Sequence, residues 1–148
     1  MFGLFRKKKK EPKKSRGLKA AFGMVVSRDN HILLIKRGYG KQKGKWSLPG
    51  GNRDQGETSK QTAIRETKEE TNIQLSPHCK LYYQTGSGWG EVWIGTPVGW
   101  RQIRYQRKEC LAAKFHSPRS LRGLLRSNRL AFHTDRKAIQ QFLDEIGE

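Results

Sequence analysis

Cysteines, acidic residues and long apolar runs are all scarce in this sequence, and each shortage narrows the classes of protein to consider. The two cysteines, Cys79 and Cys110, are not closely spaced, so neither a disulfide framework nor a zinc site with closely spaced ligands is predicted. No apolar run approaches the roughly 20 residues that cross a bilayer. The apolar segment LKAAFGMVV is short, contains a lysine and lacks a cleavage pattern, which argues against a signal peptide. We therefore expect a cytoplasmic protein.

Acids are the most depleted class, with 13 Asp and Glu against 31 Lys and Arg and a formal net charge of +18. Residues 1–19 hold nine of the basic residues and a single acid, Glu11. Their composition predicts a disordered basic tail over residues 1–18, followed by one domain over residues 19–148. A charge so far from neutral favours anionic partners, such as nucleotides, RNA, DNA or acidic lipid headgroups.

The domain contains short apolar runs before and after one central helical pattern, which indicates an α/β layer structure. Residues 20–38 predict a β-hairpin that turns at Asp29 and Asn30. Further strands are expected in WSLPGG, KLYYQ, EVWIGTPVGW and LAAKFH. The segment SPRSLRGLLRS predicts a short helix, and Thr134 is expected to cap a final helix. The apolar stripe of that last helix consists of Ala138, Ile139, Phe142, Leu143 and Ile146.

Five of the 13 acids gather in residues 51–71, the segment GNRDQGETSKQTAIRETKEET. Thr58 and Gln61 have the spacing of a capping box, so a helix is predicted from about Thr58 to Thr71. Asn72 can end this helix in a left-handed conformation. The residues expected to face a core are Ala63, Ile64, Thr67 and Thr71.

Three of these acids, Glu66, Glu69 and Glu70, have the i, i+3, i+4 spacing that places side chains on one helical face. Like charges on one face repel each other unless a cation neutralises them. Mg²⁺ prefers oxygen ligands and usually keeps waters and substrate phosphate oxygens among them. The pattern therefore indicates either a metal site or a solvated acidic face paired with nearby lysines.

The surrounding residues favour the metal site, because the segment closely resembles the Nudix box of the MutT/Nudix hydrolases. The matching spacing is Gly51, five residues, Glu57, seven residues, Arg65 and Glu66, two residues, Glu69 and Glu70, two residues, Ile73. Thr67 stands where the family usually has an aliphatic residue, and Asn72 replaces its closing glycine; neither change removes a carboxylate. KWSLPGG before the box, and LAAKFHSPRSL and LAFHTDR after it, extend the resemblance over roughly residues 19–148. It implies an α/β/α sandwich around a mixed β-sheet.

In this family the box carries the metal chemistry, and the resemblance implies cleavage of the diphosphate linkage of a nucleoside diphosphate joined to another moiety. The cofactor would be Mg²⁺ or Mn²⁺. The implied metal ligands are Glu66, Glu69, Glu70 and the backbone carbonyl of Gly51.

Two further roles come from the same resemblance. Glu57 and Arg65 would form an ion pair that holds the loop against the helix. The base that activates water differs among family members, and here it would be Glu66, Glu69 or a glutamate on a later loop. Of the later glutamates, Glu109 is preferred to Glu91, with a plain surface acid as the alternative.

The box does not identify the substrate, which loops and the sheet face would select. Arg37 and Lys45 could reach substrate phosphates, and Trp89 and Trp93 could stack a nucleobase. Solvated loop charges and core packing are the alternatives for these residues. Residues 101–129 carry nine basic residues and one acid, a density that favours a polyanion such as the 5′ end of an RNA.

The basic tail has three interpretations: an anchor to an anionic membrane surface, a nucleic-acid arm, and a flexible solubilising end. Two functions other than hydrolysis also stay open. One is a Nudix-fold binding module without catalysis, and the other is a nucleic-acid-binding protein that acts through its basic surface. The sequence shows no oligomer interface.

Overall fold

The computed structural model describes residues 18–85, 88–106 and 108–147. The predicted tail of residues 1–18 lies outside this part, except for Leu18, which begins the first strand. No helix within the described residues is long and apolar enough to cross a membrane. In chain order the elements are β1 (Leu18–Val25), β2 (Ile32–Arg37), β3 (Trp46–Ser47), β4 (Gly50–Asn52), α1 (Ser59–Thr71), β5 (Leu75–Thr85), β6 (Gly88–Pro97), β7 (Cys110–His116), α2 (Pro118–Arg126) and α3 (His133–Glu145).

The strands form two sheets. The larger has the order β4-β1-β6-β5, in which β1 and β6 are parallel while the other neighbours are antiparallel. The smaller is antiparallel throughout, with the order β3-β2-β7. The parallel pair requires a long crossover, and the chain makes it through β2, β3, β4, α1 and β5. These features confirm the predicted α/β class with a mixed sheet.

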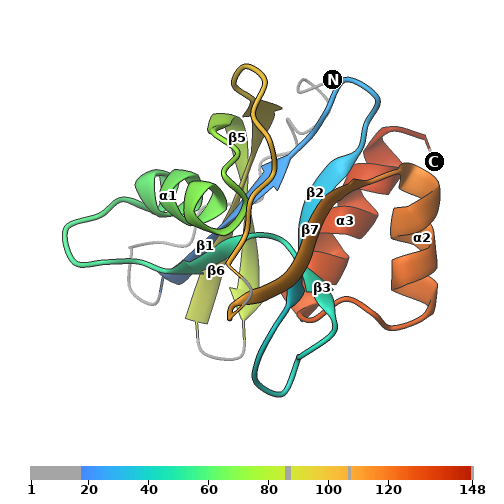
Figure 1. Cartoon of the computed structure of the whole chain (residues 1–148), viewed down its shortest axis with the longest axis horizontal. Helices are drawn as coiled ribbons and strands as arrows, with labels where there is room; N and C mark the ends of the chain where they lie inside the picture. The colour runs from blue at the N-terminus through green and yellow to red at the C-terminus, as the bar shows by residue number, and fades with distance from the viewer. Residues whose placement is uncertain (1–17, 86–87, 107, 148) are drawn as a thin grey trace.

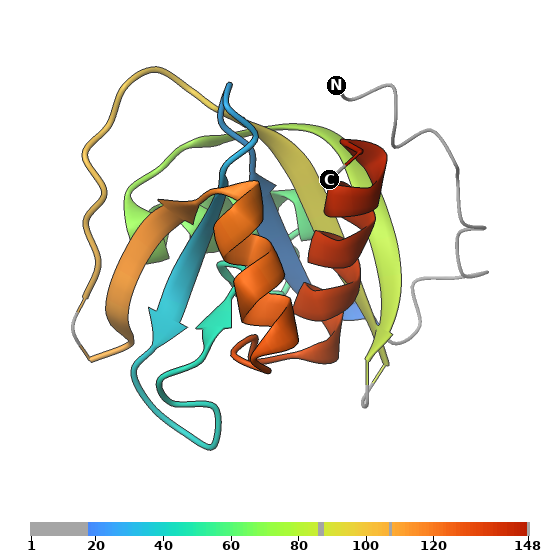
Figure 2. The ribbon, with the colours of Figure 1, turned by 90° about the vertical axis from the view of Figure 1, so that its right-hand side faces the viewer.

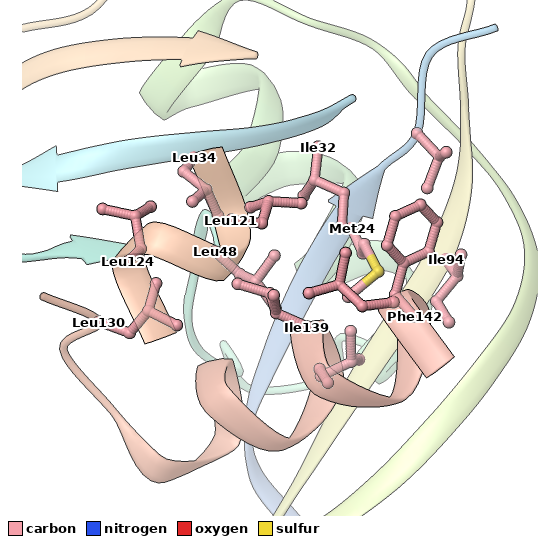
Figure 3. Packing of buried hydrophobic residues seen from close by; sticks show 14 of the residues in the cluster. Met24, Ile32, Leu34, Leu48, Ile94, Leu121, Leu124, Leu130, Ile139 and Phe142 are labelled. Carbon is pink, nitrogen blue, oxygen red and sulfur yellow. The ribbon is translucent and has the colours of Figure 1, made fainter. Parts of the chain in front are cut away.

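Helix α1 covers one side of the sheets, and α2 and α3 cover the other (Figures 1 and 2). Successive residues of β1 face opposite sides, as strand geometry requires. Met24 lies in the larger core together with Leu121 of α2 and Phe142 of α3 (Figure 3). Val25 lies in a smaller core with Ala63 of α1. The predicted α/β/α sandwich is therefore confirmed.

Helix α1 begins and ends where the sequence predicts. Thr58 accepts the Gln61 N–H at 3.1 Å and its own N–H donates to the Gln61 side chain at 2.9 Å, which completes the capping box. Asn72 ends the helix with φ 66°. The buried face differs in one respect: Ile64 is only half-buried, whereas Glu70 is buried.

The β-hairpin predicted over residues 20–38 is wrong, although its turn is present. Asn30 has a left-handed backbone with φ 60°, and Val26 forms a single antiparallel bridge with Ile32. Beyond that bridge, β1 pairs with β4 and β6, whereas β2 pairs with β3 and β7. The two strands separate because each is the interior strand of its own sheet.

The predicted cap of the last helix is also wrong. Helix α3 begins at His133, and Thr134 lies buried in its first turn. The capping acceptor is Asp135, whose carboxylate accepts the N–H of Phe132 at 3.0 Å and the N–H of Leu48 at 3.1 Å. The Asp135 carboxylate offers one oxygen to each of these N–H groups, whereas threonine has a single side-chain oxygen. Only the fold brings Leu48 to this helix. The predicted apolar stripe is buried except for its last residue.

Candidate metal and hydrolytic site

Strand β4 and helix α1 hold the carboxylates that were predicted to bind metal. Gly51 faces Glu66 so closely that a Cβ at this position would lie 2.8 Å from the Glu66 carboxylate carbon. The N–H of the adjacent Gly50 donates to Glu70 at 3.1 Å. Glycine at position 51 is thus what leaves room for the Glu66 carboxylate. The structure brings Glu66 and Glu70 together against the backbone of β4.

The three glutamates differ in exposure, contrary to the expectation of one shared polar face. Glu70 is 8 % exposed, whereas the Glu69 side chain is 57 % exposed. Burial raises the pKa of Glu70 to about 9, and the carboxylates of Glu66 and Glu109 add to the rise. A carboxyl group in this environment loses its proton readily only when positive charge comes close to it.

Arg65 is the cation that the structure places among these acids. Its Nε and Nη2 donate to the two carboxylate oxygens of Glu57 at 2.8 and 3.0 Å, so the expected ion pair is present. Its Nη1 donates to Glu66 at 3.0 Å and to Glu69 at 3.2 Å. Asp54 lies 3.3 Å from Nη2. The guanidinium therefore offsets part of the repulsion within the acidic cluster.

Glu57 connects the loop of residues 53–58 to α1. Besides Arg65, its carboxylate accepts the hydroxyl of Thr62 at 2.6 Å and the N–H of Asp54 at 3.3 Å. The hydrogen bond from Arg65 is the main cause that lowers the pKa of Glu57 to about 2. The loop turns at Gly56, where φ is 79°. These contacts fix the loop that joins β4 to the helix.

The donor set fits a hard divalent cation. Three carboxylates and a backbone carbonyl are oxygen ligands of the kind that Mg²⁺ takes. Gly51 leaves room for the Glu66 carboxylate among them, and burial is the main cause of the raised pKa of Glu70. Within the part of the chain that the structure describes, no three His, Cys, Asp or Glu side chains are grouped closely enough to hold a metal ion as they stand. Arg65 contacts both Glu66 and Glu69 in this arrangement. It contacts one carboxylate oxygen of each glutamate, Oε1 of Glu66 and Oε2 of Glu69, and the other oxygen of each takes no part in these two hydrogen bonds.

The two later glutamates lie in different places. Glu109 is exposed and close enough to Glu70 for its charge to raise the Glu70 pKa. Its backbone carbonyl accepts the N–H of Gly38 at 2.9 Å, which joins the start of β7 to the end of β2. Glu91 is instead buried, and it accepts the hydroxyl of Ser59 at the start of α1. Of the two later glutamates, Glu109 is therefore the one whose charge contributes to the raised pKa of Glu70.

Arg37 and Lys45 lie opposite each other where β2 leads into the loop before β3. The N–H of Arg37 donates to the carbonyl of Lys45 at 2.8 Å. The Arg37 guanidinium lies 5.4 Å from the ring centroid of Tyr39 and 4.8 Å from that of Phe132. Across the β2–β7 ladder Arg37 pairs with Cys110, the residue after Glu109. The backbone of Arg37 thus lies between that of Cys110 on one side and that of Lys45 on the other.

Trp93 lies on β6 next to the first turn of α1, in a different sheet from Arg37 and Lys45. Its indole N–H donates to Ser59 Oγ at 3.1 Å. The ammonium groups of Lys60 and Lys80 lie 5.7 and 5.4 Å from its ring centroid. The side chain of Trp89 lies outside the described residues.

Sequence reasoning missed two features near this site. The hydroxyl of Ser59 donates to Glu91 and holds the first turn of α1 on β6, and no spacing in the sequence predicts such a contact. The segment EVWIGTPVGW was expected to be strand throughout, but β6 ends at Pro97 and an irregular loop of residues 98–109 follows. The mixture of aromatic and basic residues in this loop was the available signal.

Comparisons with known proteins agree with this geometry. A family model described as NUDIX domain matches residues 17–140. An ADP-ribose pyrophosphatase from Methanocaldococcus jannaschii is 47 % identical over 49 residues, which cover 33 % of this chain and 29 % of the relative. An RNA pyrophosphohydrolase from Pelagibacter ubique is 38 % identical over 85 residues, which cover 53 % of each. The chain thus matches well under two thirds of the length of these relatives.

A NUDIX hydrolase structure from Nitrosomonas europaea superposes with a TM-score of 0.75 at 20 % identity, covering 89 % of this chain and 73 % of the other.

Proposed function

The chain belongs to the NUDIX family, and on that premise we propose that it is a Mg²⁺- or Mn²⁺-dependent hydrolase of the diphosphate linkage in a nucleoside diphosphate joined to another moiety. The observation that carries this proposal is the approach of β4 to α1, where Gly51 leaves room for Glu66 and the Gly50 N–H holds Glu70. Two relatives are named as a pyrophosphatase and a pyrophosphohydrolase, which supports the same reaction class.

In this proposal Glu66, Glu69, Glu70 and the Gly51 carbonyl hold the cation. When bound, such an ion neutralises phosphate charge and lowers the pKa of a coordinated water. Glu70 would bind as the carboxylate, because a nearby positive charge would oppose the effect of burial on its pKa. Arg65 stays paired with Glu57 and keeps the loop before α1 in place, so that the metal carboxylates remain oriented.

For the base that takes the proton of the attacking water, we propose Glu109 among the three candidates Glu66, Glu69 and Glu109. Glu66 and Glu69 accept hydrogen bonds from Arg65, whereas Glu109 is exposed and lies beside Glu70. A base must reach the water but need not bind metal. Glu109→Gln would then lower kcat while Mn²⁺ affinity stays near that of the wild type, whereas Glu69→Gln would lower both.

The substrate-binding roles remain proposals of the same kind. Arg37 and Lys45 would bind substrate phosphates, which the pairing of the Arg37 backbone with Cys110, the residue after Glu109, supports for Arg37; for Lys45 the support is its charge alone. Trp93 would contact a nucleobase with the part of its ring that stays exposed, since it is only half-buried. Trp89 would do the same, on the evidence of its sequence position alone.

A second candidate function is action on, or binding of, a 5′-phosphorylated RNA end. Residues 98–131 contain a single acid, Glu109, and Arg119, Arg126 and Arg129 are exposed on and after α2. The relative from Pelagibacter ubique is named RNA pyrophosphohydrolase. We further propose a cytoplasmic location, with a peripheral contact between residues 1–18 and RNA or an anionic membrane; this rests on the charge of those residues.

The test is release of phosphorylated products from a substrate panel in Mg²⁺ and in EDTA. The panel contains (d)NTPs, ADP-ribose, NADH, dinucleoside polyphosphates and 5′-triphosphorylated RNA. Wild type is compared with Glu69→Gln and with Asp144→Asn, which changes an exposed acid on α3. We expect metal-dependent cleavage that Glu69→Gln abolishes and Asp144→Asn retains. Absence of turnover across the panel, or equal loss in both variants, would refute the proposal.

A further inference from the structure

The exposed large apolar side chains of this protein are gathered in one region. Within the described residues they are Tyr39, Val98, Trp100, Tyr105 and Leu111, with exposures between 40 and 88 %. Three of the five lie in the loop of residues 98–109 between β6 and β7, and Leu111 follows that loop directly. Tyr39 is next to Gly38, whose N–H donates to Glu109 at the end of the loop. Exposed apolar side chains that gather in one stretch of chain are a feature of interaction sites.

Exposed cations alternate with these rings along the loop. Arg101, Arg104 and Lys108 are all exposed, and no ion pair joins any of them to another residue that the structure describes. The only acid from residue 98 to residue 131 is Glu109. Trp100, the most exposed ring at 88 %, lies directly before Arg101. The loop therefore offers aromatic faces and unpaired positive charge in the same stretch of chain.

The loop is fixed in place although it has no regular secondary structure. The Arg104 N–H donates to the Thr71 carbonyl at 3.0 Å, and the Asn72 side chain donates to the Gln102 carbonyl at 2.9 Å. Ile103 packs into the smaller core under α1. Because Ile103 points inward, its neighbours are presented to solvent. A surface that is ordered before binding loses less conformational entropy when a ligand binds.

These anchors also place the loop beside the metal carboxylates. Thr71 and Asn72 immediately follow Glu69 and Glu70 at the end of α1, so the two hydrogen bonds hold Gln102 and Arg104 beside the end of that helix. Figure 1 shows the loop as the gold segment that passes the end of α1 before entering β7. A ligand that extends from the proposed metal site along this loop, past the end of α1, therefore meets Arg104 and then Trp100.

We propose that residues 98–106 of this loop bind single-stranded nucleic acid, with Trp100 and Tyr105 stacking on bases and Arg101 and Arg104 contacting phosphates. Aromatic faces accept any base, and a basic groove follows the backbone, which together are the means by which proteins bind single strands. Trp100 and Tyr105 are separated by up to about 17 Å of extended chain, a span that exceeds a single nucleotide. The inference deepens the second candidate function, because it gives a 5′-phosphorylated strand a path away from the hydrolytic site.

Binding is measured separately from catalysis, in EDTA, so that it does not depend on turnover. The probe is a single-stranded RNA of about 12 nucleotides with a fluorescent label at its 3′ end, a length within the range that known single-strand sites cover. Its binding is measured by fluorescence anisotropy. We expect Trp100→Ala to weaken binding about tenfold and Trp100→Phe, which keeps a ring, to restore most of the affinity. The double variant Arg101→Gln/Arg104→Gln should reduce the slope of log affinity against log salt by about 1.4, because each phosphate contact on a single strand contributes about 0.7.

The matched control is Arg28→Gln/Lys137→Gln, which removes the same charge from exposed positions in the turn before β2 and on α3, outside residues 98–131. Helix α3 lies on the opposite side of the sheets from α1 (Figures 1 and 2). Equal losses in the control and in the loop variant would overturn the proposal, because diffuse charge would then explain binding. Unchanged affinity of Trp100→Ala would overturn it as well, as would binding to anionic vesicles without binding to RNA. If wild type hydrolyses nothing on the panel while the loop variants still weaken RNA binding, the proposed hydrolase fails and the binding surface stands.

Discussion

Adding a single methyl group at Gly51 should impair metal binding while leaving the stability of the fold almost unchanged. A Cβ at this position would lie 2.8 Å from both the carboxylate carbon and one oxygen of Glu66. Ordinary contacts of this kind begin near 3.4 Å, so the Glu66 carboxylate must withdraw by about 0.6 Å or more. The clashing atoms are the flexible end of a side chain, and φ of Gly51 is not positive. Gly51→Ala should therefore fold with little loss of stability.

The same displacement should be costly for function. Metal–ligand distances tolerate deviations of only about 0.2 Å, and a misplacement of about 1 Å in a catalytic arrangement can lower the rate about 100-fold. We therefore expect Gly51→Ala to lower kcat/KM by about 100-fold, while its Tm stays close to that of the wild type. The assay is metal-dependent product release combined with thermal unfolding.

Gly50→Ala provides the matched comparison on the adjacent residue. There a Cβ would lie 2.5 Å from the carbonyl oxygen of Ala21 and 2.8 Å from Cα of Phe22, and backbone in the middle of a sheet cannot move aside. Gly50→Ala should therefore lower the Tm markedly. If Gly51→Ala retained full metal affinity and turnover, Gly51 would not be the residue that makes room for a metal-binding Glu66, and the reasoning would be refuted.

Three further predictions concern the helices and the ion pair. Gly123→Ala in α2 should raise stability by about 1 kcal/mol in urea denaturation, because its Cβ meets nothing within 4 Å and alanine favours helix; a loss of stability would contradict this. Burial raises the pKa of Asp135 to about 7 and lowers the pKa of His116 to about 4. Between pH 4 and 6.5 the first shift makes stability fall with rising pH and the second makes it rise. Asp135→Asn removes the first shift, so the stability of this variant should fall less steeply with rising pH than that of the wild type in this window, and equal slopes in the two proteins would count against the raised pKa of Asp135. Glu57→Gln should lower Mn²⁺ affinity about 10- to 100-fold, because Arg65 loses the partner that keeps it in place; calorimetric titration showing unchanged affinity would argue that the pair has no such role.

The sequence was most informative where an element is specified by its own residues. The capping box of Thr58 and Gln61 and the left-handed Asn72 act within one helix, so α1 was predicted with its correct ends. The separation of β1 from β2 could not be predicted, because local apolar patterning does not show which strands flank each of them. The Nudix box gave the family correctly.

Long-range contacts explain what was missed in the site. The burial of Glu70 depends on the approach of Gly50 from another element, and helical spacing alone placed it with the exposed Glu69. Asp135 acts as a cap partly because it also reaches Leu48, which is 87 residues away in the chain. The loop of residues 98–109 was expected to be strand in part, and its exposure depends on the single inward-pointing Ile103.

The central claim is that Glu66, Glu69 and Glu70 bind a divalent cation, and a Mn²⁺ titration followed by electron paramagnetic resonance tests it most directly. The signal of free Mn²⁺ is measured for wild type, for Glu69→Gln and for Asp144→Asn at equal protein concentration. The account predicts binding by wild type and Asp144→Asn, and an affinity more than about tenfold weaker in Glu69→Gln. No binding by wild type, or equal binding by all three proteins, would contradict it.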